Sequence, residues 1–245
     1  MVTGILPLKL DGVVGKRRGK RRIGPVSMNL IETGITMSLG PNGSGKSTLL
    51  MAAAGLLPAK GSVAWNDRPL ADISVMERGR MAAWVPQEAQ FSFGFTVRSV
   101  VGQGRFAHGD DEAGVNEALA RFELEELADR PVNQLSGGER QRVMLARSIV
   151  VQPQIYFWDE PLAALDVKHA LQVLVLAREL TQAGATVFMS LHDLRLATCL
   201  DRVVVLQEGK LRADGSPEEV LSDEMLRDVF GVAVLKEGGW TLRLA

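Results

Sequence analysis

The sequence predicts a protein of the α/β class, and three observations support this prediction. Residues 34–39 alternate into a glycine-rich loop and residues 46–54 follow as a helical segment, which makes a strand–loop–helix unit. From Ile155 onward, short apolar runs alternate with helical patterns, as expected for a parallel sheet with crossover helices. Between these regions, residues 97–129 have a helical periodicity rich in Ala, Glu and Leu, which indicates a helical insert.

The remaining elements follow in chain order. Glycines and β-branched residues dominate the first sixty positions and indicate strands and turns. After the insert we expect a helix, a strand, a helix and a strand, over residues 140–151, 155–158, 169–182 and 186–191.

The C-terminal part has a different pattern. Glu208-Gly209 separates two β-rich runs, residues 203–207 and 210–213, and predicts a hairpin. Ser216, followed by a proline and then by a glutamate three residues after the serine, is typical of a capped helix start. A last short helix is expected from Ser222 to just before Gly231.

Composition limits the class of protein. The chain has 245 residues, is 46% hydrophobic and carries a formal net charge of -1. This near balance argues against nucleic acid as the main partner, because phosphate binding usually requires a basic excess. The only cysteine is Cys199, which fits a reducing cytosol. We expect no signal peptide at the N-terminus, and the longest apolar run, residues 49–59, is far shorter than the roughly 20 residues of a membrane span.

A glycine-rich segment after the first predicted core strand matches the phosphate-binding P-loop pattern in full. Glycines let backbone N–H groups converge on an anion, and the helix that follows directs its positive end toward the phosphates. Lys46 is expected to reach the β- and γ-phosphates, Ser47 to ligate Mg²⁺, and Thr48 to add a phosphate contact. The matching residues are Gly40, Pro41, Asn42, Gly43, Ser44, Gly45, Lys46 and Ser47.

Two acids end the apolar run Ile155-Tyr156-Phe157-Trp158. A buried strand delivers its last residues to the edge of a parallel sheet, where ligands bind. Asp159 is therefore a candidate for the Mg²⁺ shell, and Glu160 is a candidate general base for an attacking water.

The segment Leu135-Ser136-Gly137-Gly138-Glu139-Arg140-Gln141 adds a second site suited to an anion, with a serine N-cap and two glycines before an apolar helix. With this segment the chain resembles the ATPase subunits of ABC transporters. The resemblance implies an ATPase in which ATP and Mg²⁺ lie between two copies of the chain. Ser136, Gly137 and Gly138 of one copy would then close on the γ-phosphate held by Lys46 of the other.

The same resemblance implies further roles for residues that occur in the family's order. Gln87 is similar to the loop glutamine that touches Mg²⁺ and the attacking water, where the membrane subunit docks. Asp166 is similar to the aspartate at the dimer interface, and His192 to the histidine that contacts the γ-phosphate.

The fold that the resemblance implies is the P-loop NTPase fold of ABC ATPases: a mainly parallel sheet core, an N-terminal antiparallel β subdomain and an inserted helical subdomain. We expect a single domain over residues 1–245. Its parts would be a β subdomain with the P-loop core, a helical subdomain with Ser136–Gly138, the rest of the catalytic core, and C-terminal helices with a tail, over residues 1–90, 91–152, 153–215 and 216–245.

One feature departs from the family pattern. Residues 10–30 contain no aromatic side chain to stack on adenine, and six basic residues crowd between Lys16 and Arg22 instead. One of Arg17, Arg18, Arg21 or Arg22 would stack on the base. The alternatives are a solvated hairpin and contact with anionic lipid headgroups.

The helical insert is similar to importers of iron–siderophore complexes, haem and cobalamin at Arg105-Phe106-Ala107-His108, where Ala107 replaces the usual proline. Arg195 likewise replaces the usual asparagine after His192. Either the Arg105–His108 segment is a solvated loop, or it lies beside Gln87 and receives a permease helix. We therefore expect an importer ATPase that pairs with itself and with permease subunits, acts indirectly with a solute-binding protein, and lies on the cytoplasmic face of a bacterial inner membrane. The alternatives are an exporter ATPase, another metal importer, or an ABC ATPase without a transport role.

Overall fold

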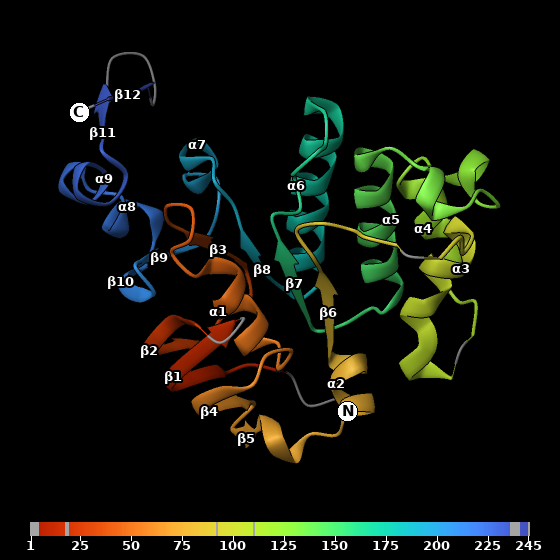
Figure 1. Cartoon of the computed structure of the whole chain (residues 1–245), viewed down its shortest axis with the longest axis horizontal. Coiled ribbons are helices and arrows are strands. Elements are labelled where there is room, and N and C mark those ends of the chain that lie inside the picture. Colours follow the sequence, from red (N-terminus) through yellow and green to blue (C-terminus); the bar gives the residue numbers. More distant parts are fainter. Residues whose placement is uncertain (1–4, 18–19, 92, 110, 236–240, 245) are drawn as a thin grey trace. The chain divides into compact units, whose positions relative to one another are not determined.

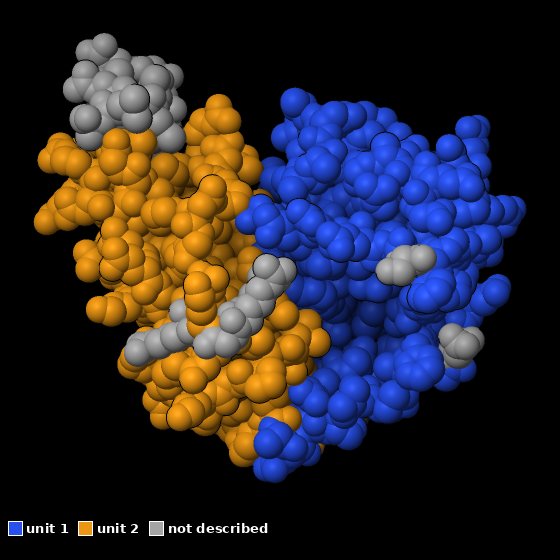
Figure 2. All heavy atoms as spheres, in the orientation of Figure 1, with its two compact units in different colours: residues 1–5, 71–187 blue, residues 6–70, 188–245 orange. Residues whose placement is uncertain are grey.

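The computed structural model describes residues 5–17, 20–91, 93–109, 111–235 and 241–244. The chain divides into two compact units, which Figure 2 colours separately: unit 1 comprises residues 1–5 and 71–187, and unit 2 comprises residues 6–70 and 188–245. Mainly parallel strands, an antiparallel sheet and helices together make the α/β fold that the sequence predicts (Figure 1).

Unit 2 begins with an antiparallel sheet in the order β2-β1-β4-β5. Residues of β2 alternate between buried and exposed side chains, so the sheet buries one face. Helix α1 lies against β1, and the Trp65 indole at the end of β4 donates to the Ala53 carbonyl at 3.0 Å. The bounds are β1 Leu8–Arg17, β2 Lys20–Leu30, α1 Lys46–Ala53, β4 Ala59–Trp65 and β5 Arg68–Pro69.

The rest of unit 2 contains parallel strands and the C-terminal elements. β3 (Ile35–Leu39) pairs in parallel with β9 (Arg202–Gln207), and β9 pairs antiparallel with β10 (Lys210–Gly215), which confirms the predicted hairpin. The predicted helix starts are also confirmed, because Ser216 and Ser222 cap α8 and α9. The remaining elements are α7 Leu194–Ala197, α8 Pro217–Val220, α9 Asp223–Phe230, β11 Val232–Leu235 and β12 Thr241–Leu244.

In unit 1, β6 (Ala82–Val85) pairs in parallel with β7 (Ile155–Asp159). Every residue of β7 is buried, as expected for a parallel strand covered on both faces. The chain then enters β8 (Thr186–Ser190), which begins in unit 1 and ends in unit 2.

The predicted helical insert is confirmed, but it is divided into short pieces. The helix predicted over residues 140–151 begins earlier, at Gly137, because Ser136 and Glu139 form a capping box at its start. The helices outside unit 2 are α2 Val75–Met81, α3 Val97–Gly102, α4 Val115–Arg121, α5 Gly137–Val150 and α6 Val167–Gln182. The 3₁₀ turns are η1 Leu70–Asp72, η2 Gln103–His108, η3 Glu125–Leu127 and η4 Val132–Gln134. In the part of the chain that is described, no helix is long and apolar enough to span a membrane.

Candidate functional site

The P-loop of unit 2 connects β3 to α1. Lys46 is 5% exposed, and its Nζ donates to the carbonyl of Gly40 at 2.8 Å and of Pro41 at 3.3 Å. The side chain of Lys46 therefore folds back over its own loop, and its ammonium group lies at the loop carbonyls. The Ser44 hydroxyl is buried in the same loop and has no hydrogen-bond partner among the described residues.

Glycine is required at two positions of this loop. A Cβ on Gly40 would lie 2.1 Å from the carbonyl oxygen of Leu206, and one on Gly45 would lie 2.4 Å from Ile23 Cγ2. Gly45, with φ 109°, is the N-cap of α1 and leaves the helix start without a side-chain cap. A helix start whose N-cap residue has no side chain leaves room for an anion, and this arrangement fits a bound phosphate.

The two acids predicted at the end of β7 lie in unit 1. Asp159 is 4% exposed and Glu160 is half-buried. The Gln87 amide nitrogen donates to Glu160 Oε2 at 2.9 Å, so two residues 73 positions apart in sequence meet here. Glu160 has φ 50°, in the left-handed region that residues other than glycine, asparagine and aspartate seldom adopt.

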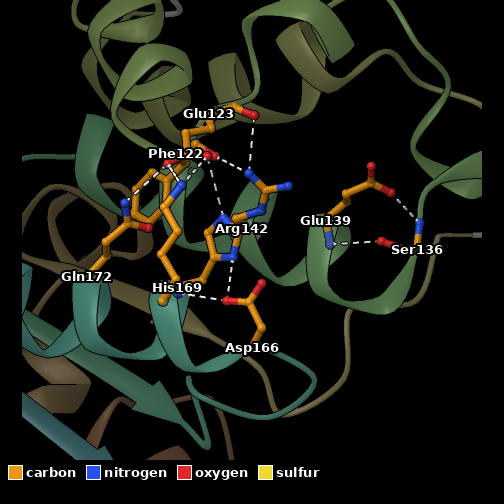
Figure 3. Close-up of polar contacts among 9 residues, drawn as sticks. Phe122, Glu123, Ser136, Glu139, Arg142, Asp166, His169 and Gln172 are labelled. Carbon is orange, nitrogen blue, oxygen red and sulfur yellow. Dashed lines mark hydrogen bonds and ion pairs between the residues drawn. The ribbon is translucent and has the colours of Figure 1, made fainter.

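The start of α5 carries the serine and two glycines singled out in the sequence. The Glu139 N–H donates to Ser136 Oγ at 3.3 Å, and the Ser136 N–H donates to Glu139 Oε2 at 2.7 Å (Figure 3). Hydrogen bonds from the Ser136 side chain and backbone to the Glu139 carboxyl group lower the pKa of that group. A Cβ on Gly138 would lie 2.8 Å from the Ala164 carbonyl oxygen, so α5 begins in close contact with the loop before α6.

Asp166 and His192 each lie at the end of a loop or strand. Asp166 is the N-cap of α6, and its exposed carboxylate accepts the His169 backbone N–H, a bond that lowers the pKa of the Asp166 carboxyl group. His192 follows β8 in unit 2 and is exposed. The structure therefore brings Gln87 and Glu160 together within unit 1, whereas Lys46 and His192 belong to unit 2.

The basic run occupies the β1–β2 hairpin of unit 2. Lys16 pairs with Arg21 and Arg17 with Lys20 in the strand register. Lys20 and Arg22 are exposed, and the Arg22 carbonyl lies 2.8 Å from the position of a Cβ on Gly45. Arg18 and the side chains of Arg17 and Arg21 lie outside the described part of the chain, so all three interpretations of the run stay predictions.

The solvated-loop interpretation is wrong for Arg105. This residue is 7% exposed, and its guanidinium donates to Asp111 at 2.6 and 3.0 Å and to the Val150 carbonyl at 2.9 Å. Arg105 thus joins η2 to Val150, the last residue of α5. The next residue, Phe106, is 66% exposed and is therefore accessible to a partner.

The sequence reasoning missed two groups of residues. The Ser136-x-x-Glu139 spacing is itself a capping-box signal and could have been found. The contact of His169 with Asp166 and Glu123 was also missed, and only the three-residue spacing of Asp166 and His169 hinted at it.

Comparison with known proteins gives a consistent result. The family model described as ABC transporter matches residues 23–163. Hemin import ATP-binding protein HmuV of Rhodococcus jostii is 38% identical over 94% of this chain and 81% of that protein. HmuV of Streptomyces coelicolor is 46% identical over 78% of this chain and 71% of that protein. The dimeric ATP-binding cassette MJ0796 bound to ADP and Pi is 27% identical, with a TM-score of 0.78 over 86% of this chain and 98% of that one.

Proposed function

Because this chain belongs to the ABC transporter family, we propose that it is the ATP-hydrolysing subunit of a haem importer. The observation that carries the hydrolytic part is the 2.9 Å hydrogen bond from Gln87 to Glu160. It joins the residue proposed to orient water to the residue proposed to take its proton. The HmuV relatives favour haem over siderophores or cobalamin as the cargo.

The roles of the site residues form part of this proposal. The loop from Gly40 to Thr48 holds the phosphates of ATP, with Lys46 on the β- and γ-phosphates. Ser47, Gln87 and Asp159 are the proposed Mg²⁺ ligands, and bound Mg²⁺ neutralises charge on the phosphates. Glu160 acts as the general base, and His192 contacts the γ-phosphate. The buried lysine amine and the uncapped start of α1 support the phosphate assignment.

The proposed site is completed by a second copy of the chain. Ser136, Gly137 and Gly138 contact the γ-phosphate of the partner copy, and Asp166 lies at the interface between copies. The dimeric state of the ATP-binding cassette MJ0796 supports this assembly. The single-domain organisation with a β subdomain, a helical subdomain and C-terminal helices belongs to the same proposal.

A permease is the proposed membrane partner, and its docking surface lies in unit 1. A hollow of about 580 Å³ is lined by Trp84, Phe106 and Arg147, among other residues. Phe93 and Phe95, which follow Gln87 in sequence, are 71% and 49% exposed and form an edge-to-face pair. Exposed aromatic rings, among them Phe106 in the wall of the hollow, suit a helix of a protein partner. We place the chain on the cytoplasmic face of a bacterial inner membrane, in indirect partnership with a solute-binding protein.

Replacing Glu160 with glutamine tests the hydrolytic assignment. The amide keeps the size of the side chain but cannot accept a proton, so Glu160→Gln is expected to bind ATP, to lose at least about a hundredfold in turnover and to accumulate an ATP-bound dimer. Turnover and size-exclusion elution with ATP are the measurements. The exposed Glu126→Gln, in the same unit, is the matched control for loss of one negative charge. Normal turnover in Glu160→Gln would remove this residue from the role of base.

Purification from membranes tests the transport assignment. The tagged chain is expected to co-purify with a permease of many membrane-spanning helices, and Phe106→Asp and Phe93→Asp are each expected to reduce that yield. ATP turnover of the isolated chain should stay unchanged in both variants. Recovery with an export partner or with nucleic acid would contradict the proposal.

A further inference from the structure

A network of side chains in unit 1 connects the start of α6 with Arg142 of α5, one turn after Gly138 (Figure 3). At the α6 end, Asp166 Oδ1 accepts two bonds from one residue: the His169 backbone N–H at 2.9 Å and the His169 ring nitrogen Nδ1 at 2.8 Å. A carboxylate can only accept, so Nδ1 carries the hydrogen. The imidazole therefore holds the Asp166 side chain in addition to the usual helix cap.

The other ring nitrogen of His169 is directed toward Glu123. Nε2 is buried without a hydrogen-bond partner among the described residues, and it lies 3.7 Å from Glu123 Oε2. Lys168 donates to both Glu123 carboxylate oxygens, at 2.6 and 2.9 Å, and Gln172 donates to one at 3.2 Å. These contacts, the Lys168 bond above all, lower the pKa of Glu123 to about 2. The histidine ring thus stands between two ionised carboxylates.

The turn that carries Glu123 is itself fastened to α5. Arg142 Nη1 donates to the carbonyl oxygens of Phe122 at 2.6 Å and of Glu123 at 3.1 Å. Arg142 lies on α5 one turn after Gly138, so the same short helix carries the Ser136–Gly138 segment at its start and the anchor for Glu123. Contacts therefore run from Asp166 through His169 and Glu123 to Arg142, and the backbone of α5 joins Arg142 to that segment.

We propose that His169 is a positioning residue that ties Asp166 to the start of α5, so that Asp166 and Ser136–Gly138 meet the second copy as one rigid surface. This inference rests on the proposed function, in which both segments contact the partner. A surface that is already ordered loses less conformational freedom on association, which tightens the dimer. His169 acts through Asp166 and touches neither ATP nor the reacting water.

The two arms of the ring can be tested separately. The side-chain amide of asparagine reaches about as far as Nδ1, and that of glutamine about as far as Nε2, so His169→Asn keeps only the Asp166 arm and His169→Gln only the Glu123 arm. The assay is sedimentation of the ATP-bound dimer of full-length protein in a Glu160→Gln background. His169→Ala is expected to raise the dimer dissociation constant about tenfold. Each copy contributes one network, and a weakening of about threefold from each of the two networks multiplies to about tenfold. His169→Asn and His169→Gln should each recover part of that loss.

Two controls separate positioning from a general loss of structure. Affinity of the monomer for ATP should stay unchanged in every variant, because the Lys46 loop belongs to unit 2. Glu179→Gln breaks the Arg121–Glu179 ion pair, which also joins α4 to α6 but lies outside the network, and it should leave the dimer constant unchanged. The exposed Glu123→Gln removes the carboxylate charge of the Glu123 arm and keeps the Asp166 arm, so it should weaken the dimer as His169→Asn does.

The outcomes distinguish the two proposals. An ATP-dependent parent dimer that forms equally tightly with His169→Ala and Glu123→Gln overturns the inference alone. Weaker ATP binding by the His169→Ala monomer also overturns it, since the residue would then serve the fold in general. A parent protein that never dimerises with ATP overturns the proposed function, and this inference fails with it.

Discussion

Glu160 combines a proposed catalytic carboxylate with a backbone conformation that L-residues avoid, at φ 50°. Its strain can be measured by comparing Glu160→Ala with Glu160→Gly. Both variants lose the carboxylate and the bond from Gln87, so those effects cancel in the comparison. The two variants differ only by one Cβ atom at a left-handed position.

The expected difference follows from the backbone alone. A left-handed conformation costs an L-residue about 1–2 kcal/mol, whereas glycine adopts it freely. Folding in turn costs glycine about 0.5–1 kcal/mol more conformational entropy than alanine, because the unfolded chain is more flexible at glycine. We therefore expect Glu160→Gly to be more stable than Glu160→Ala by about 0.5–1 kcal/mol, or roughly 1–4 °C in Tm for a chain of this length. Neither variant should hydrolyse ATP.

Urea unfolding of the nucleotide-free protein is the assay. Glu208, in the β9–β10 turn, is exposed and also has φ 50°, so Glu208→Gly and Glu208→Ala form a matched pair outside the proposed site. The glycine variant should be the more stable one at both positions. If glycine stabilises residue 208 but destabilises residue 160, relative to alanine, the strain argument for Glu160 is refuted.

Two further predictions concern buried aromatic residues. Burial raises the pKa of Tyr156, the only tyrosine, so absorbance should show no phenolate near pH 10 while the chain is folded. Because the pKa of Tyr156 is higher in the folded than in the unfolded chain, its contribution to the free energy of unfolding is complete below about pH 10. Above that pH the contribution falls by about 1.4 kcal/mol per pH unit. An equally steep fall of the unfolding free energy with pH in Tyr156→Phe would contradict this. Trp65→Phe leaves the Ala53 carbonyl without its donor, at an expected cost of about 1–3 kcal/mol in urea unfolding, and a wild-type midpoint would show that the bond contributes nothing.

Much of this protein was predictable because the informative signals are local. The P-loop, the acids that end β7, the Glu208-Gly209 hairpin and the Ser216 cap each depend on a few consecutive residues whose backbone preferences act together. The start of α5 was predicted three residues late, although the Ser136-x-x-Glu139 spacing carried the necessary signal. The roles given to the site residues stay predictions, because they depend on a bound nucleotide and a second copy.

Long-range contacts were decided only by the tertiary structure. The sequence allowed Arg105 to be a solvated side chain, and its burial became evident only when Asp111 and Val150 were found around it. His169 and Glu123 are 46 positions apart, and no periodicity or motif connects them. The reason is physical: a motif needs only neighbouring residues and the backbone between them, whereas an ion pair between distant segments depends on how whole helices pack. The sequence by itself thus determined which motifs the chain carries, whereas the tertiary structure decided which distant residues meet, as where α6 and Arg142 of α5 both contact the Phe122–Glu123 turn.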